Sequence, residues 1–239
     1  MNLSDKIRKT LTKTADGVVL TPADFDVPIS HQPSLLVSLN RLVAKGTLKR
    51  LSRGKYYKPK DSIFGELPPD TYQKVKEFIV KDGQVIGYIT GTNAFATLGL
   101  TTQISGEIMI GTNTYRRPRT RGVDRISFVL QPNLIREDEI DFYVILDALR
   151  FINDIPATTS SEAVEILIKV IRRLPKLRQK RLQELAMLYT PSVRALLGAI
   201  YERLSLPTKA LRDSLNGTTY YRLHIDNDVL PTKSNWRIL

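Results

Sequence analysis

The chain has 239 residues, of which 42% are hydrophobic and 25% are charged, and its formal net charge is +12 at pH 7. This composition is sufficient to bury a core and excludes a disordered polymer. The absence of cysteine excludes disulfides, thiolate metal sites and thiol nucleophiles, and it fits a reducing compartment. The first residues, MNLSDKIRKTL, lack the apolar core of a signal peptide, so we expect a cytoplasmic protein with no membrane partner.

The positive charge is concentrated at the beginning of the chain. Residues 1–60 contain 12 Lys or Arg against four Asp, whereas residues 61–239 contain 24 basic residues against 20 acidic ones. A localised basic region is the footprint expected of nucleic-acid binding, whereas an inert basic protein would spread its charge. We expect one domain over residues 1–60, a linker over residues 61–70 and a larger domain over residues 71–239.

The first domain is predicted to be a winged helix-turn-helix. Its predicted elements are a helix from Leu3, an extended piece at Val18–Leu20, a short helix from Thr21 and a long helix over Ser30–Lys45. Pro33 is tolerable only in the first turn of the long helix, and Gly46 stands just past its end. A tight basic hairpin follows over Lys49–Lys58. This order of elements is typical of a helix-turn-helix with a wing.

The long helix and the hairpin hold the predicted DNA-binding residues. From Arg41 to Lys60 there are eight Lys or Arg and no acidic residue. In a winged helix, the helix lies in the major groove and the hairpin reaches the neighbouring backbone or minor groove. The residues predicted to bind DNA are His31, Ser34, Ser38, Arg41 and Lys45 on the helix, and Lys49, Arg50, Arg53, Lys55 and Lys58 on the hairpin. The alternative is a solvated polar face, with His31 only filling the first turn.

The second domain is predicted to be mixed. Strand patterns lie between residues 85 and 130, helical patterns between residues 140 and 215, and a last strand pattern over residues 218–225. The complete fold is therefore predicted to be α+β, with an N-terminal winged helix followed by a larger mixed α/β domain whose C-terminal part is helical.

Two further basic groups lie in the second domain. Arginine-rich loops bind phosphates or acidic partners, or simply cross solvent, and basic helix faces are usually solvated or bind a protein partner. The residues concerned are Arg116, Arg117, Arg119 and Arg121 in a connection between strands, and Arg172, Arg173, Lys176 and Arg178 around Pro175. No phosphate-binding loop, paired metal-binding histidines or acid–base pair is recognisable. We therefore predict no catalytic residue, no metal and no cofactor.

Three stretches of the sequence resemble a known family. The runs GVVLTPADF, SLLVSLNRLVAKGTLKRLSRGKYYKP and GYITGTNAFATLGLTTQ are similar to the AbiE-type (AbiEi-like) antitoxins of type IV toxin–antitoxin systems in abortive infection. The resemblance is clearest over residues 1–130. It implies a winged helix that represses its own operon by binding inverted repeats at the promoter. It also implies a second domain that counteracts a nucleotidyltransferase-like toxin without forming a stable complex with it.

The function expected from the sequence is that of a DNA-binding transcriptional autoregulator and antitoxin, and not of an enzyme. Its expected partners are double-stranded promoter DNA and a toxin. Two alternatives remain open at this stage. One is a winged-helix regulator whose second domain senses a small ligand in an apolar pocket. The other is an enzyme acting on nucleic acid and anchored by the winged helix, which would need a metal or an acid–base pair.

Overall fold

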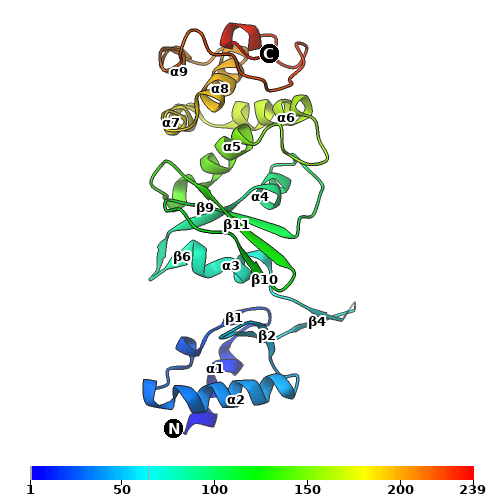
Figure 1. Ribbon diagram of the computed structural model, residues 1–239, viewed down its shortest axis with the longest axis vertical. Coiled ribbons are helices and arrows are strands. Elements are labelled where there is room, and N and C mark those ends of the chain that lie inside the picture. Colours follow the sequence, from blue (N-terminus) through cyan, green and yellow to red (C-terminus); the bar gives the residue numbers. More distant parts are fainter. Residues whose placement is uncertain (1, 64) are drawn as a thin grey trace. The chain divides into compact units, whose positions relative to one another are not determined.

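The computed structural model describes residues 2–63 and 65–239 of the chain (Figure 1). The chain divides into two compact units, which are an N-terminal unit of Met1–Glu77 with Thr120–Asp124 and a C-terminal unit of Phe78–Arg119 with Arg125–Leu239. The described residues form nine α-helices and several small sheets, which confirms the predicted α+β class. In the same residues, no helix is both long and apolar enough to span a bilayer.

The N-terminal unit combines two helices with a small sheet. Its first elements are α1 (Leu3–Lys13), β1 (Val19–Leu20), the 3-10 turns η1 (Pro22–Phe25) and η2 (Ile29–His31), α2 (Gln32–Ala44), β2 (Lys49–Ser52) and β3 (Lys55–Tyr57). The strands form an antiparallel sheet in the order β1-β3-β2. The buried core of these elements consists of Ile7, Leu20, Phe25, Leu35, Leu39, Leu48 and Tyr56. The long helix therefore begins two residues later than predicted, because η2 occupies its expected first turn.

The stretch that was predicted as a linker is folded. It contains an antiparallel hairpin of β4 (Lys60–Ser62) and β5 (Gly65–Leu67), in which the Ser62 hydroxyl donates to the Gly65 carbonyl at 2.7 Å. Helix α3 (Thr71–Ile79) follows, and its Gln73 side-chain carbonyl accepts a bond from the Val19 amide at 3.2 Å. The boundary between the two units falls inside α3. Gly65 and the two prolines at 68 and 69 suggested a flexible linker, but local hydrogen bonds order this segment.

The segment after α3 consists of strands and one short helix. These are β6 (Val80–Lys81), β7 (Gln84–Val85), β8 (Gly87–Thr90), α4 (Thr92–Thr97), β9 (Glu107–Thr112), β10 (Arg119–Arg121) and β11 (Asp124–Leu130). All of these residues belong to the C-terminal unit except Thr120, Arg121 and Asp124, which are grouped with the N-terminal unit. The four-stranded sheet has the order β10-β11-β9-β8, with β8 antiparallel and β11 parallel to β9. Part of the predicted arginine-rich connection is therefore an edge strand, β10.

The helical half of this unit is organised around one buried helix. The elements are η3 (Glu137–Glu139), α5 (Ile140–Arg150), α6 (Ser160–Arg173), α7 (Lys176–Ala186), α8 (Pro191–Arg203), α9 (Lys209–Asp213) and η4 (Lys233–Trp236). Figure 1 shows α5 between the sheet and α6–α8, and every residue from Phe142 to Leu149 is buried. Such burial on all sides fits the continuous apolar pattern of this segment.

The strand predicted over residues 218–225 does not form. Tyr221 makes only an isolated bridge to Ile238, and His224 has φ +50°, which breaks the extended conformation. Tyr221, Leu223 and Ile225 are all buried, so their alternation reflects packing into the helical core. An alternating hydrophobic pattern indicates which side chains are buried, but it does not indicate whether a neighbouring strand is present to form a sheet.

A buried polar network joins the sheet to the helices of the C-terminal unit. The Asp147 side chain on α5 is buried and accepts hydrogen bonds from the hydroxyls of Tyr88 (2.6 Å), Thr90 (2.8 Å) and Tyr189 (3.2 Å). The Gln131 amide donates to the Tyr88 and Tyr189 hydroxyls at 2.7 and 2.6 Å. Burial raises the pKa of the Asp147 carboxyl above its usual value, although the three hydroxyls act in the opposite direction.

We expect Asp147→Asn to change how stability depends on pH. A carboxyl whose pKa is raised by folding stabilises the folded chain below its unfolded pKa of about 3.9, and this contribution is lost as pH rises through the folded pKa. The stability of the wild type relative to Asp147→Asn should therefore be highest near pH 4 and decline toward pH 7. Urea unfolding across this range measures it, with the exposed Asp154→Asn as control. A relative stability that rises with pH would show that the hydroxyls, and not burial, dominate.

Candidate functional site

Helix α2 presents its polar side chains at an angle fixed by its buried leucines. Leu35 and Leu39 are fully buried, whereas Val37 is 51% exposed. At 100° per residue, Val37 and Ala44 lie opposite the buried pair. Ser34, Ser38, Arg41 and Lys45 therefore lie to one side of the line on the helix that is farthest from the core. Ser38 is half-buried, and its hydroxyl donates to the Ser34 carbonyl at 2.9 Å.

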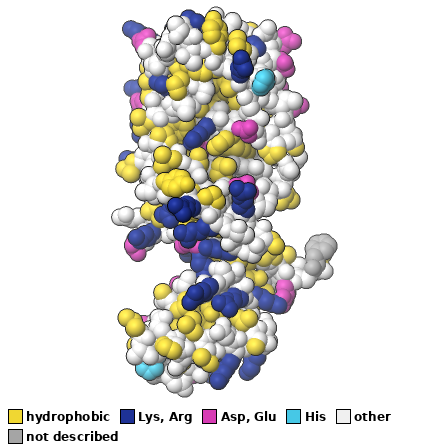
Figure 2. Space-filling model, viewed as in Figure 1, with side chains coloured by type: hydrophobic (Ala, Val, Ile, Leu, Met, Phe, Trp, Pro, Cys, Tyr) yellow, Lys and Arg dark blue, Asp and Glu magenta, His cyan; other side chains and the backbone are white. Residues whose placement is uncertain are grey.

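Three of these residues, Ser38, Arg41 and Lys45, line a groove between α1 and α2. The groove has a volume of about 680 Å³. Its lining residues are Ser4, Ile7, Arg8, Leu11, Thr12, Ser38, Arg41, Leu42, Lys45, Thr47, Leu48 and Lys58. Four of them are basic and none is acidic, so a negatively charged ligand is favoured there. On the face drawn in Figure 2, Lys and Arg side chains lie among hydrophobic ones over this unit.

Internal ion pairs divide the basic residues of the groove into two classes. Arg8 lies 3.6 Å from Asp5, and Lys58 lies 2.7 Å from Asp16. Arg41 and Lys45 are exposed, and neither has an acidic partner among residues 2–63 and 65–239. Arg41 and Lys45 are therefore the groove cations that can bind an external anion without first breaking an ion pair.

The predicted basic hairpin forms, with Lys49 opposite Tyr57 and Arg50 opposite Tyr56. Arg53 and Gly54 make its turn, and Arg53 is exposed. Arg53 has no ion pair within the described part of the chain, whereas the exposed Arg50 uses its Nε to donate to the Ser52 carbonyl at 3.4 Å. The tip of the hairpin therefore presents Arg53 to solvent.

The hairpin lysines are compensated by acids from other segments. Lys49 lies 2.8 Å from Glu66, and this bond raises the pKa of Lys49. Lys55 bonds to the Glu77 carboxylate of α3, which also accepts from the Arg121 guanidinium. Burial raises the pKa of Glu77, but the bonds from Arg121 and Lys55 outweigh burial and lower it overall. Binding a phosphate through Lys49 or Lys55 would require an exchange of partners.

The remaining predicted arginines fall into different environments. Arg121 also donates to the Lys74 carbonyl, so it belongs to the N-terminal unit's own bonding. The Arg116 and Arg119 guanidinium groups lie 5.8 and 5.6 Å from the centre of the Phe78 ring, which is a cation–π distance. Arg117 is exposed. These four side chains therefore do not form a single phosphate-binding cluster.

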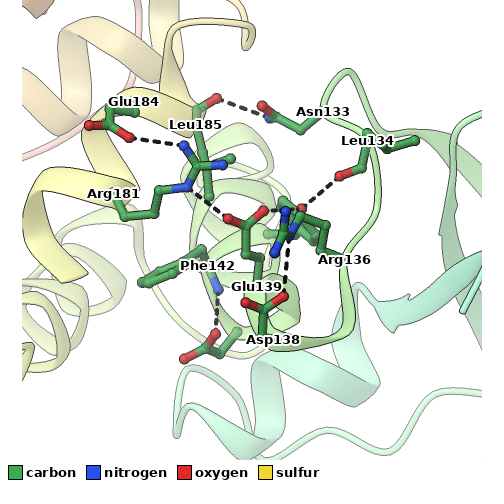
Figure 3. A network of polar contacts seen from close by, with 11 residues as sticks. Asn133, Leu134, Arg136, Asp138, Glu139, Phe142, Arg181, Glu184 and Leu185 are labelled. Atoms are coloured by element: carbon green, nitrogen blue, oxygen red, sulfur yellow. Dashed lines mark hydrogen bonds and ion pairs between the residues drawn. The ribbon is translucent and has the colours of Figure 1, made fainter. Parts of the chain in front are cut away.

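The second predicted basic group, around Pro175, is partly neutralised by an acid in the first turn of α5. Arg178 pairs with Asp141 and lies 4.2 Å from the centre of the Phe142 ring. Figure 3 shows the neighbouring contact, in which Arg181 bonds to Glu139 at 2.7 Å and to Glu184 at 2.9 Å. The exposed members of this group are Arg172, Arg173 and Lys176.

Sequence reasoning missed the contribution of α1 to this site. Arg8 and Thr12 line the groove, although neither was predicted as a binding residue. The signal was present, because these two residues directly follow Ile7 and Leu11, which mark the inward stripe of the first helix. His31 was placed correctly at the start of the helix. It is exposed, and its Nδ1 lies 3.2 Å from the Ser30 hydroxyl.

Comparison with known proteins assigns the chain to a family. A family of unknown function, DUF6088, matches residues 6–185. The chain belongs to this DUF6088 family. No curated protein matches it. As a DUF6088 member it is similar in fold to the crystal structure of the RV2827C protein from Mycobacterium tuberculosis, with a TM-score of 0.50 and 13% identity over 92% of this chain and 84% of that one.

We expect Gly54→Ala to destabilise the hairpin by about 1 kcal/mol. Gly54 has φ +71° and nothing lies within 4 Å of an added Cβ, so the cost comes from the left-handed backbone alone. Gly54→Asn is the matched variant, since asparagine tolerates this conformation better. Urea unfolding monitored by circular dichroism measures both variants. An equal cost for Asn and Ala would point to a different cause.

Proposed function

We propose that this DUF6088 member is a sequence-specific DNA-binding transcriptional autoregulator and the antitoxin of an AbiE-like system. The observation that carries the DNA-binding part is the set of unpaired cations on one helix and the adjoining hairpin. Arg41 and Lys45 on α2 and Arg53 on the hairpin are exposed and have no acidic partner in the described residues. Such cations can bind DNA phosphates without first breaking an ion pair, and their binding releases the counterions condensed on the DNA.

The arrangement of elements supports a winged-helix mode of binding. The chain runs in the order α1, β1, η1, η2, α2, β2 and β3, with β1, β3 and β2 in one sheet. This order resembles a helix-turn-helix with a wing, although the short helix predicted from Thr21 is the 3-10 turn η1. In this mode α2 enters the major groove, and the hairpin contacts the backbone or the minor groove. Val37, Asn40 and Arg41 would face the bases, and Ser34 and Ser38 would lie at the side of the contact.

The cations then divide by role. Lys45 and Arg53 neutralise phosphates directly, whereas Arg8 on α1 can do so only by exchanging its pair with Asp5. Lys49, Lys55 and Lys58 contact phosphates only by exchanging Glu66, Glu77 and Asp16 for the DNA backbone. A complex that neutralises about six phosphates would show a log–log salt slope of about −5.

The antitoxin part of the proposal rests on the sequence resemblance. One of the three resembling stretches lies in the C-terminal unit. It is GYITGTNAFATLGLTTQ, which forms β8, α4 and the residues that follow α4. We propose that this unit counteracts a nucleotidyltransferase-like toxin. Co-expression with a toxin encoded beside the chain's own gene tests this proposal, since rescue of growth is expected and continued toxicity would oppose it.

The groove favours one further candidate function, that of a ligand-sensing regulator. Its floor includes Ile7, Leu42 and Leu48, and its volume of about 680 Å³ falls in the range of small-molecule sites. A small metabolite that raises the melting temperature and also releases DNA would support this candidate.

Changes in charge at the hairpin should shift DNA affinity in opposite directions. Arg53→Ala should weaken binding equally on all sequences and reduce the salt slope by about one unit. Glu77→Gln should strengthen binding on all sequences, because it removes a negative charge that pairs with Lys55 on the hairpin. Fluorescence anisotropy at two salt concentrations measures both, with Glu165→Gln on α6 as a control for net charge. Weaker binding by Glu77→Gln would mean that Glu77 positions the hairpin for DNA.

Arg41→Ala should instead reduce specificity. If Arg41 reads a guanine, its loss should cost about 1–3 kcal/mol on the cognate duplex and little on a scrambled one. Lys45→Ala is the matched control, because loss of a phosphate contact lowers both affinities alike. Equal losses on the two duplexes for Arg41→Ala would remove it from base reading.

A further inference from the structure

A second cavity lies in the C-terminal unit, among residues that the proposed function does not use. Its volume is about 210 Å³, and its polar lining includes Arg212, Asn216, Gly217, Tyr221, Asn235 and Arg237. No acidic residue lines it. The volume is below the range of about 300–1,000 Å³ typical of drug-sized ligands, so a ligand with few heavy atoms fits best.

One of its two guanidinium groups is held in place by the fold. The Arg212 Nη2 donates to Glu202 Oε2 at 2.8 Å, and its Nη1 donates to the Asn235 carbonyl at 3.3 Å. The group also lies 4.5 Å from the centre of the Trp236 ring. Glu202 is bound further by the Trp236 Nε1 and the Asn235 amide, both at 2.6 Å. Arg212 is therefore a preorganised positive charge at the cavity wall.

The second guanidinium, that of Arg237, has no acidic partner among residues 2–63 and 65–239. Its backbone is left-handed, with φ +56°, a conformation that is unfavourable for a residue other than glycine. The position is fixed because the Arg237 amide donates to the Ser234 carbonyl at 3.1 Å and its carbonyl accepts from the Tyr221 amide at 2.8 Å. Gly217 leaves room beside the guanidinium, since a Cβ there would lie 4.0 Å from Nη2.

A buried hydroxyl completes the set. Tyr221 is 8% exposed, and its hydroxyl oxygen is buried without a hydrogen-bond partner in the described part of the chain. An unsatisfied buried polar group is destabilising, and such groups commonly mark the position of an ion or a water. The Arg237 guanidinium has no acidic partner in the described residues and lies 5.4 Å from the centre of the Tyr220 ring, and Arg237 and Tyr221 both line this small cavity.

We propose that this cavity binds a phosphate group, either as the free ion or as part of a small phosphorylated metabolite. Arg237 supplies the bidentate contact that suits a phosphate, and Arg212 adds a second guanidinium group, whose charge is partly compensated by Glu202. The Tyr221 hydroxyl, which is buried without a partner in the described residues, is the candidate donor of a third bond. This site is independent of DNA binding by the N-terminal unit.

The test is isothermal titration calorimetry of the full chain without DNA. Inorganic phosphate and a phosphomonoester, glycerol 3-phosphate, are titrated separately at constant ionic strength. We expect saturable binding that weakens at least tenfold in Arg237→Gln and several-fold in Tyr221→Phe. Arg222→Gln, which removes an exposed arginine from the same segment but not from the cavity, should bind as the wild type does. Circular dichroism melting without phosphate checks that each variant is folded.

Tighter binding of inorganic phosphate would indicate the free ion as the ligand, and tighter binding of glycerol 3-phosphate would indicate a phosphorylated metabolite. Either result supports the proposed site. Three results would overturn the proposal: no saturable binding by the wild type, undiminished binding by folded Arg237→Gln, or an equal loss in Arg222→Gln. The last result would mean that phosphate only screens the positive surface. None of these outcomes depends on whether the chain binds DNA.

Discussion

The burial of Leu35 and Leu39 determines which side chains of α2 are available to a partner. Both are fully buried with Ile7, Leu48 and Tyr56, so rotation of the helix by one position would place a leucine in solvent. Burying such a side chain contributes about 1.5–3 kcal/mol, which is large compared with any single surface contact. The orientation of Arg41 and Lys45 beside α1 is therefore a consequence of core packing.

Ion pairs within the chain then reduce the number of basic side chains that are available to bind DNA. The N-terminal region carries a large excess of basic residues, but Lys49, Lys55 and Lys58 each have a carboxylate partner. Exposed ion pairs of this kind contribute little to stability, so they can exchange with phosphates, yet each exchange reduces the gain. Arg41, Lys45 and Arg53 carry no such cost, and the proposed interface therefore centres on them.

Signals close together in the sequence were sufficient for much of the fold. Pro33 and Gly46 located the ends of α2 to within a turn, and the basic run around Gly54 indicated the hairpin. Partners far apart in sequence were not predictable: Glu77 lies 22 residues from Lys55, and nothing local indicates their contact. The alternation at Tyr221, Leu223 and Ile225 was equally misleading, because helices rather than a neighbouring strand bury these side chains. The Asp147 network was missed because a single acid in an apolar helix does not reveal its hydroxyl partners.

The central claim is that the N-terminal unit reads DNA. The most direct test is a gel-shift titration of the wild-type chain at two salt concentrations. It would compare the DNA upstream of the chain's own gene with a scrambled duplex of the same length. The account predicts tight, salt-sensitive binding that prefers the native sequence. Absence of binding at both salt concentrations would contradict it and would assign the basic helix and hairpin to a protein partner.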